Sequence, residues 1–227
     1  MPGMMPCMPT IEQRLSVDTG KGTVSAVFVT PKKGAPVLVI AHGAGAGMDH
    51  PFLVGFAGGM NEQGVATMRF NFPYMEAGRR SPGAPAVAVA AWRAVFEAVT
   101  ERAAGAPVVA GGKSYGGRMA SVAVAEGMPA AGLVFLGYPL HAPGTPDKVR
   151  DEHLYEIKVP MLFLHGTGDA FAQDDLLRAV VKKLGKRATL HQVEGGDHSF
   201  NVRGAKASPR DVGASLAPVA AAFVKGL

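Results

Sequence analysis

The sequence predicts an α/β domain in which a mostly parallel β-sheet carries helices on both faces. Short aliphatic runs without polar alternation indicate strands buried on both sides, and helical segments separate these runs along the chain. The chain has 227 residues, of which 48% are hydrophobic, so it can bury a core without disulfides; its single cysteine, Cys7, has no partner. We expect one domain over residues 11–227, after a disordered tail at residues 1–10.

The predicted sheet begins with a hairpin at its edge. Residues 11–17 and 23–30 alternate partly in polarity and flank the turn sequence DTGKG, which indicates two antiparallel edge strands. Continuous β-branched and aliphatic runs then predict the buried strands. These runs cover residues 37–41, 65–70, 107–110, 133–136 and 161–164, and a further run at residues 189–193 follows later in the chain.

Helices are expected between the strands and near the end of the sequence. The segments with helical character are residues 51–63, 85–103, 115–126 and 174–184. In the second segment Trp92 shares the apolar face, so we expect it in the core. A last helix is expected from Ser208, since the sequence SPRD offers an N-cap, a proline at the first helical position and an acid at the third.

Composition and charge argue against several classes of protein. Glycine and proline interrupt the apolar runs, so no segment of about 20 residues predicts a membrane helix. The first ten residues, MPGMMPCMPT, lack the basic head and apolar run of a secretory signal, and we expect a cytoplasmic protein. The net charge of +5 invites a nucleic-acid partner, but the basic residues concentrate only at a helix end, at residues 182–187, where they suit the helix dipole. We therefore expect no nucleic acid and no membrane as partner.

Two segments resemble phosphate-binding loops without satisfying their patterns. The GKS at residues 112–114 resembles the end of a P-loop, but the motif requires glycine where this chain has Pro107. The GAG at residues 43–45 follows a predicted strand, yet the third glycine of GxGxxG would fall on Met48. Nucleotide binding is therefore a weak alternative, and we expect no cofactor.

The same region satisfies a different motif, G-x-S-x-G, with GKSYG at residues 112–116. The motif lies between a predicted strand and a predicted helix, which is the context of a nucleophile elbow. Small residues two before and two after Ser114 are a steric requirement of this tight turn. Gly112 and Gly116 satisfy that requirement, and Gly117 lets the following helix approach the sheet.

A nucleophilic serine needs a base to take its proton and an acid to orient the base. Asp169 follows the predicted strand at residues 161–164, and His198 follows the run at residues 189–193. Their order after Ser114 is serine, acid, histidine, as this architecture requires. Alone, Asp169 could be a helix cap and His198 a surface residue. Their joint placement at strand ends favours a Ser114–His198–Asp169 triad.

The negative oxygen that forms on attack needs N–H donors that are already in position. We expect one from Tyr115, next to the nucleophile, and one from Ala44 in the loop that follows the strand at residues 37–41. His42 and Gly43 in this loop are candidate substrate-binding residues.

Six segments carry a resemblance to a known family: LVIAHGAGAGMDHPF, MRFNFPY, AGGKSYGGRMAS, LGYPLH, LHGTGDAF and GGDHSF. From about Val37 onward the chain resembles the dienelactone-hydrolase-like family of α/β hydrolases, which also includes testis-expressed and NSL-complex subunit proteins. The resemblance implies an eight-stranded α/β-hydrolase fold with Ser114, Asp169 and His198 as its triad. True dienelactone hydrolases use a cysteine nucleophile, which argues against their lactone substrate here. The expected activity is hydrolysis of small esters or thioesters, and the alternative is a non-catalytic binding or scaffold protein with this fold.

Other polar residues are expected near the same end of the sheet. Tyr138 and His141 are candidate substrate-binding residues, with Arg150 and His153 beside them; the two histidines have no metal-ligand spacing, so we expect no metal. The connection over residues 139–159 is short for a lid, which predicts an open pocket.

Polar residues near the expected oxyanion loop and elbow permit two interpretations. We expect a hydrogen-bonded brace there, with a substrate anion held by one of the arginines as the alternative. The residues concerned are Asp49, His50, Arg69 and Arg118. Lys113 is expected on the opposite face of its strand from Ser114. The sequence leaves the oligomeric state open.

Overall fold

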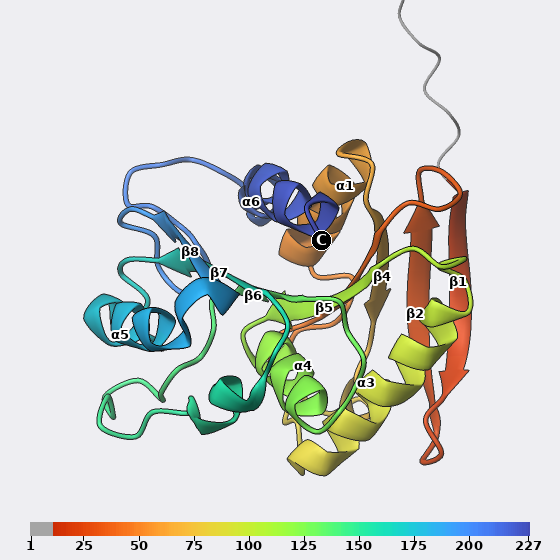
Figure 1. The fold of residues 1–227 in the computed structure, drawn as a ribbon, viewed down its shortest axis with the longest axis horizontal. Helices are drawn as coiled ribbons and strands as arrows, with labels where there is room; N and C mark the ends of the chain where they lie inside the picture. Colours follow the sequence, from red (N-terminus) through yellow and green to blue (C-terminus); the bar gives the residue numbers. More distant parts are fainter. Residues whose placement is uncertain (1–10) are drawn as a thin grey trace, which may run out of the picture.

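An eight-stranded sheet forms the centre of the structure, a computed structural model that describes residues 11–227 (Figure 1). The strand order is β1-β2-β4-β3-β5-β6-β7-β8; β1 and β2 are antiparallel to their neighbours, and the other strands pair in parallel. The strands are β1 (Ile11–Asp18), β2 (Thr23–Thr30), β3 (Val37–Ala41), β4 (Ala66–Phe70), β5 (Val108–Lys113), β6 (Leu133–Leu136), β7 (Met161–Gly166) and β8 (Ala188–Val193). The predicted tail at residues 1–10 lies outside the described part of the chain.

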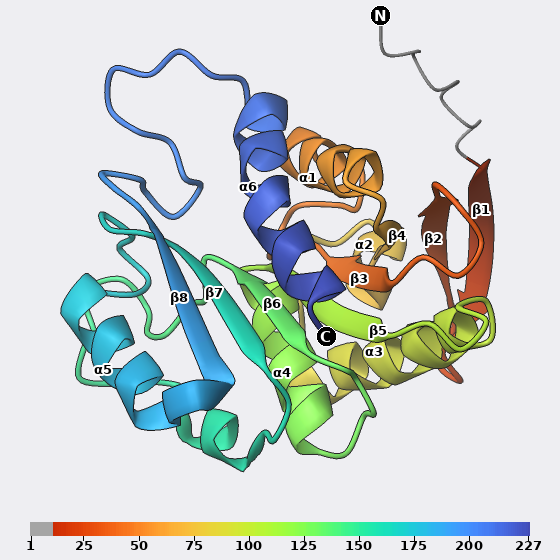
Figure 2. The ribbon, with the colours of Figure 1, turned by 45° about the horizontal axis from the view of Figure 1, so that its top comes forward.

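Helices cover both faces of the sheet, as predicted. In Figures 1 and 2, α1 and α6 lie side by side on one face, and α3, α4 and α5 lie on the other. The helices are α1 (Pro51–Glu62), α2 (Pro73–Glu76), α3 (Pro85–Thr100), α4 (Tyr115–Ala125), α5 (Asp174–Leu184) and α6 (Pro209–Lys225). The Ser208 hydroxyl accepts from the Asp211 N–H and the Asp211 carboxylate accepts from the Ser208 N–H, which completes the capping box at the start of α6. Trp92 is fully buried, and its indole N–H donates to the Gly116 carbonyl.

Three details differ from the predictions. β2 is not an edge strand, because its residues 26–29 pair with β4 and its apolar side chains are buried there. β5 continues past Ala110 to Lys113, since Gly111 and Gly112 pair with β6. Helix α2 and the 3-10 turns at Glu152–Glu156 and Gly185–Arg187 were not predicted, because elements of three to five residues show no helical periodicity.

The contact between α1 and α6 is unusually close because glycines form it. A Cβ on Gly55 would overlap the Arg210 carbonyl, and a Cβ on Gly213 would overlap the Phe52 carbonyl. Further along, a Cβ on Gly59 would lie 2.7 Å from the Ala217 Cβ. The two helices can therefore approach only where a side chain is missing.

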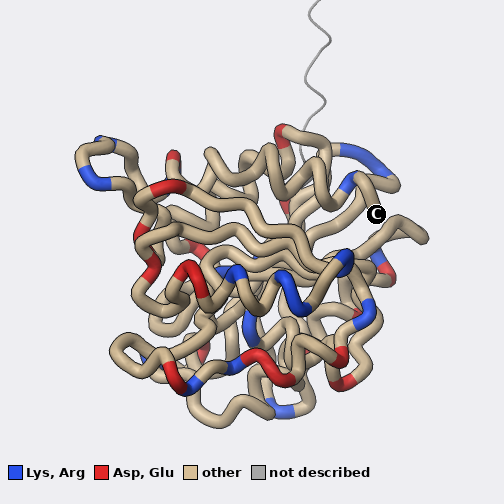
Figure 3. Tube along the Cα trace, turned by 60° about the vertical axis from the view of Figure 1, so that its left-hand side comes forward, with Lys and Arg blue, Asp and Glu red and all other residues tan. Residues whose placement is uncertain are grey.

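Charged residues of both signs are interspersed over the face shown in Figure 3. Within the basic run at residues 182–187, Lys183 lies 3.9 Å from the Tyr155 ring centroid, and Arg187 donates to the carbonyls of Tyr155 and Ile157. These two cations thus hold the segment before β7. None of the helices within residues 11–227 is both long and apolar enough to cross a membrane.

Candidate active site

Ser114 occupies a strained turn between β5 and α4. Its φ of 50° and ψ of −117° are rare for a residue with a side chain. The turn fits only because its neighbours are glycines: a Cβ on Gly112 or Gly116 would collide with the Ala41 carbonyl, and one on Gly117 would lie 2.6 Å from the Gly112 carbonyl. This is the backbone of a nucleophile elbow, and the glycines have the steric role that the motif predicts.

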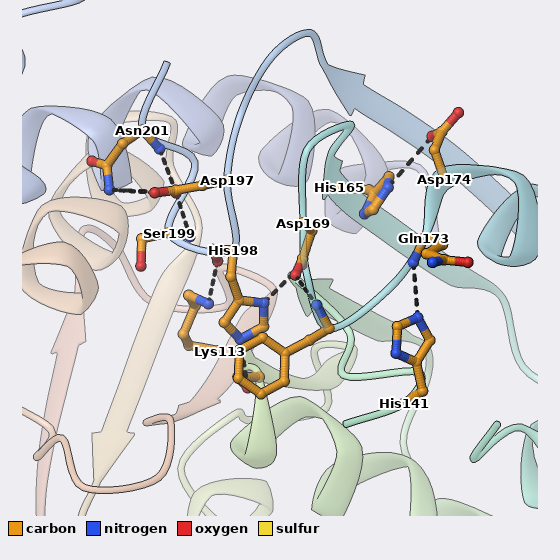
Figure 4. A network of polar contacts seen from close by, with 12 residues as sticks. Lys113, His141, His165, Asp169, Gln173, Asp174, Asp197, His198, Ser199 and Asn201 are labelled. Carbon is orange, nitrogen blue, oxygen red and sulfur yellow. Dashed lines mark hydrogen bonds and ion pairs between the residues drawn. The ribbon is translucent and has the colours of Figure 1, made fainter. Parts of the chain in front are cut away.

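The structure brings Ser114, His198 and Asp169 together in one chain of hydrogen bonds. Figure 4 shows the part between His198 and Asp169. The Ser114 Oγ lies 2.8 Å from the His198 Nε2, and the His198 Nδ1 lies 2.7 Å from the Asp169 Oδ2. The carboxylate requires the proton on Nδ1, which leaves Nε2 as the acceptor for the serine hydroxyl. In this tautomer the imidazole can remove the hydroxyl proton while Asp169 stabilises the resulting cation.

Asp169 is held in place by the loop after β7. Its side chain is fully buried, and its Oδ1 accepts from the Phe171 N–H at 2.7 Å. A Cβ on Gly166 would lie 2.6 Å from the Asp197 carbonyl, so the absence of a side chain there lets the loop that carries His198 lie against this one. The Gly168 N–H donates to the Gly196 carbonyl at 2.8 Å. The acid and the base are thus connected through their backbones as well as their side chains.

The loop that carries His198 is a tight turn organised by the Asp197 carboxylate. Asp197 Oδ1 accepts from the backbone N–H groups of Ser199 and Asn201 at 2.7 and 2.9 Å. Burial alone would raise the pKa of Asp197, but these hydrogen bonds, those from Asn201 foremost, lower it. On the side of the imidazole, the Phe171 ring lies 4.2 Å from the His198 ring, centroid to centroid, and limits its rotation.

Lys113 lies beside the site, and the prediction that its side chain points away was wrong. Its Nζ donates to the His198 carbonyl at 2.6 Å and lies 5.8 Å from the Phe200 ring centroid. Burial lowers the pKa of Lys113 to about 8, although the carboxylates of Asp169 and Asp197 act in the opposite direction. The alternation of side chains along a strand predicts only the face on which a side chain starts. The Lys113 side chain is long enough to reach around the end of β5 from there.

The loop after β3 runs directly beside Ser114. A Cβ on Gly43 would lie 3.7 Å from the Ser114 Cβ, and Ala44 lines the adjoining cavity. The N–H groups of Ala44 and Tyr115 have no hydrogen-bond acceptor among residues 11–227. Two backbone donors next to the nucleophile are therefore available to a ligand.

A cavity of about 440 Å³ opens next to Ser114 and His198. Its apolar wall comes from the starts of α1 and α6 and from the loop after Asp169, and its polar wall from Lys113 and the loop that carries His198. Further lining residues, not singled out from the sequence, are Phe52, Leu53, Phe171, Ser199, Asn201 and Pro209. Residues of α6 are far from the elbow in sequence, so no motif indicates that they meet it. None of the lining residues belongs to residues 139–159, so this connection does not cover the cavity.

Three of the expected substrate-binding residues do not line this cavity; of the four, only Gly43 does. His42 is fully buried and accepts from the Phe72 N–H at 3.1 Å, while burial lowers its pKa. The Tyr138 hydroxyl donates to the Arg150 carbonyl at 2.7 Å, and burial raises its pKa. His141 accepts from the Gln173 N–H at 3.0 Å. All three use their polar atoms to hold the backbone of connecting segments: Phe72 before α2, Arg150 in the connection after β6, and Gln173 before α5.

A further buried histidine lies near Asp169 and Asp174. His165, at the end of β7, is fully buried, with its Nε2 3.4 Å from the Asp174 Oδ1 (Figure 4). Burial lowers the pKa of His165, although the nearby Asp169 and Asp174 act in the opposite direction. Neither ring nitrogen of His165 makes a hydrogen bond within residues 11–227, so His141, which accepts from Gln173, is the histidine that holds the segment between Asp169 and α5.

The polar residues around the loop after β3 mostly act as a brace. Arg69 is buried and donates to the Met48 carbonyl and to the Asp49 carboxylate, the latter at 3.0 Å. The His50 Nδ1 accepts from the Phe52 N–H at 3.3 Å and so caps α1, while its ring lines the cavity. Arg69 thus uses its guanidinium to bind other residues of the protein, which argues against a role in binding a substrate anion.

His153 belongs to a separate cluster under α4. Its Nε2 lies 2.8 Å from the Ser121 Oγ and 3.4 Å from the Tyr138 hydroxyl. Burial, and then the nearby Arg118 guanidinium, lower the pKa of His153 to about 4. This contact fixes the connection over residues 139–159 onto α4. Across the described chain, no three His, Cys, Asp or Glu side chains are placed to hold a metal ion.

The fold and the geometry of this site define the class of protein. Residues 34–225 match the family described as alpha/beta hydrolase domain, and the chain belongs to that family.

Several solved structures share this fold. A dienelactone hydrolase from Anabaena variabilis is 18% identical, with a TM-score of 0.74 over 96% of this chain and 98% of that chain. An α/β serine hydrolase homologue from Coxiella burnetii is 18% identical, with a TM-score of 0.73 over 95% and 97%. A lidless α/β serine hydrolase from Xanthomonas campestris is 21% identical, with a TM-score of 0.67 over 86% and 89%. The predicted dienelactone-hydrolase-like fold is confirmed.

Proposed function

We propose that this chain is a serine hydrolase that cleaves small esters or thioesters through an acyl-enzyme intermediate. The observation that carries the proposal is the pair of hydrogen bonds that joins Ser114, His198 and Asp169, at 2.8 and 2.7 Å. A hydroxyl, an imidazole and a buried carboxylate in this order form a nucleophile, its base and the group that orients the base.

In the acylation step, the Ser114 Oγ attacks the acyl carbon and the His198 Nε2 takes the hydroxyl proton. The Asp169 carboxylate stabilises the imidazolium through Nδ1. The bond to the leaving oxygen or sulfur then breaks, and His198 donates its proton to that atom. The products of this half are the acyl-enzyme and a free alcohol or thiol.

In the deacylation step, a water molecule repeats the attack. His198 removes a proton from the water as its oxygen bonds to the acyl carbon, and then returns the proton to the Ser114 Oγ as the acyl bond breaks. In both steps the negative charge on the acyl oxygen is stabilised by the N–H groups of Ala44 and Tyr115. Tyr115 directly follows the nucleophile in the chain, and Ala44 lines the same cavity as Ser114.

The role of Ser114 is tested by Ser114→Ala. Hydrolysis of p-nitrophenyl acetate should fall on the order of 10⁴-fold or more, because the nucleophile is removed while the cavity remains. Ser199→Ala is a matched control, since this exposed serine lies in the same cavity wall without contacting the imidazole. Unchanged turnover in Ser114→Ala would remove this serine from the mechanism.

The alternative, a binding or scaffold protein with this fold, predicts a different chemical behaviour. A fluorophosphonate probe should label the wild-type chain at Ser114 alone, because only a serine with an adjacent base attacks phosphorus quickly. Absence of labelling in folded protein would favour the scaffold. A cytoplasmic location and the lack of a nucleic-acid partner stay predictions from the sequence.

A further inference from the structure

The Lys113 ammonium is an ionisable group of the cavity that the proposed mechanism does not use. It follows Gly112 in β5 and immediately precedes the nucleophile, yet its Nζ ends at the carbonyl of His198, 85 residues later in the chain. The bond is 2.6 Å long, which is typical of a strong, charge-assisted hydrogen bond. It connects the backbone of the nucleophile segment to the backbone of the base.

The surroundings of the ammonium explain how it is held there. A Cβ on Gly137 would lie 3.3 Å from the Lys113 Nζ and 3.4 Å from the His198 Nδ1, so the missing side chain leaves room for both groups. The charged groups that face the ammonium are the carboxylates of Asp169 and Asp197, and the Phe200 ring covers one side. These contacts offset part of the cost of burying a charge next to the site.

The loop that carries His198 is attached to the rest of the protein on two sides. The exposed Ser199 and Asn201 both donate backbone N–H groups to the Asp197 carboxylate, and Phe200 adopts a left-handed φ of 64°. On the side of Asp169 the loop is fixed by the Gly168–Gly196 hydrogen bond. On the side of Ser114, the Lys113 bond links it to the strand that carries the nucleophile.

We propose that Lys113 is a positioning residue for the proposed hydrolysis: its ammonium holds the backbone of His198 so that the imidazole stays in line between Ser114 and Asp169. This inference rests on the proposed function. An uncharged side chain of similar length would fill the same space but would not hold the carbonyl. Small displacements of a catalytic base are costly, since about 1 Å can lower the rate 10²-fold.

The test compares Lys113→Met, Lys113→Cys and a chemically restored amine. In a Cys7→Ser background, Lys113→Cys is alkylated with 2-bromoethylamine in urea and refolded, which rebuilds a side chain of nearly the length of lysine with a terminal ammonium. Lys182→Met, on the exposed face of α5, is the matched control for the loss of one lysine. Turnover of p-nitrophenyl acetate and the low-field proton NMR signal of the His198–Asp169 hydrogen bond are measured for each.

We expect kcat to fall about 10- to 100-fold in Lys113→Met and Lys113→Cys while KM stays within threefold, and the alkylated protein to recover most of kcat. The low-field NMR signal should broaden in both variants, and it should become sharp again in the alkylated protein, where the amine is restored. A raised KM with unchanged kcat would overturn the inference, because it would make Lys113 a substrate contact. Unchanged kcat and an unchanged signal would overturn it as well.

Failure of the proposed function is distinguishable from failure of this inference. If the wild-type chain neither turns over esters nor reacts with the fluorophosphonate, the hydrolase proposal fails, and the NMR signal alone decides whether Lys113 orders the imidazole. If the wild-type chain reacts and Lys113→Met reacts equally fast, the hydrolase proposal stands and the positioning role is wrong.

Discussion

At the scale of single residues, His153 predicts an acid-sensitive stability. Its folded-state pKa of about 4 lies below the ordinary histidine value of 6.5, because burial disfavours the charged imidazole. Its contribution to the free energy of unfolding is therefore complete above pH 6.5 and is lost as the pH falls from 6.5 toward 4. Between pH 7 and pH 4.5, urea denaturation should show a larger loss of stability for the wild type than for His153→Gln, which cannot titrate.

The control for this prediction leaves every histidine in place. Lys182→Met, on the exposed face of α5, should show the same difference between the two pH values as the wild type. An equal loss in the wild type and in His153→Gln would mean that protonation of His153 does not break the contact with Ser121.

The role of a residue is predictable from the sequence where a motif defines the backbone geometry. It is not predictable where the role depends on the direction in which the side chain points. The elbow at Ser114 follows from glycines that only a tight turn requires, and the positions of Asp169 and His198 follow from strand ends. His42 and His141 also lie at strand ends, but their rings turn inward to accept backbone N–H groups. Lys113 was misjudged because a four-carbon side chain can leave the face of the strand on which it starts.

At the scale of elements, the α1–α6 contact makes a prediction about packing. Gly213→Ala should destabilise the fold by about 1–3 kcal/mol, because its Cβ would overlap the Phe52 carbonyl and the helices would have to separate. Gly58→Ala is the matched control, since nothing lies within 4 Å of a Cβ there and alanine favours a helix by about 0.5–1 kcal/mol. Urea denaturation of both variants measures the difference; a neutral Gly213→Ala would show that the contact can relax.

Most helices and strands were predictable because their apolar pattern extends over enough residues to be recognised in the sequence. The buried strands and the helices α1, α3, α4 and α5 are where the apolar pattern predicts them. The position of β2 within the sheet was not predictable, since a hairpin pattern does not say which strand the hairpin joins. The contact of α6 with α1 was not predictable either, because it joins segments about 160 residues apart in the chain.

At the scale of the whole molecule, the cavity predicts the size of the substrate. A volume of about 440 Å³ suits a small ligand, and the connection over residues 139–159 is packed onto α4 instead of covering the opening. Each buried methylene adds about 0.8 kcal/mol of binding, but a long acyl chain would leave most of its methylenes in water. In a panel of p-nitrophenyl esters from two to sixteen carbons, kcat/KM should be highest for short chains. A maximum at long chains with interfacial activation would show that some segment closes over the cavity.

The contact of α6 with α1 also has a consequence for synthesis on the ribosome. Helix α1 is made well before α6, the helix that covers it and that supplies Pro209 to the wall of the cavity. Domains of this kind complete their packing only when the late segments emerge. Until then the apolar face of α1 is open to other chains in the cell, so the nascent protein is most exposed to aggregation and to chaperone binding just before residues 209–225 leave the exit tunnel.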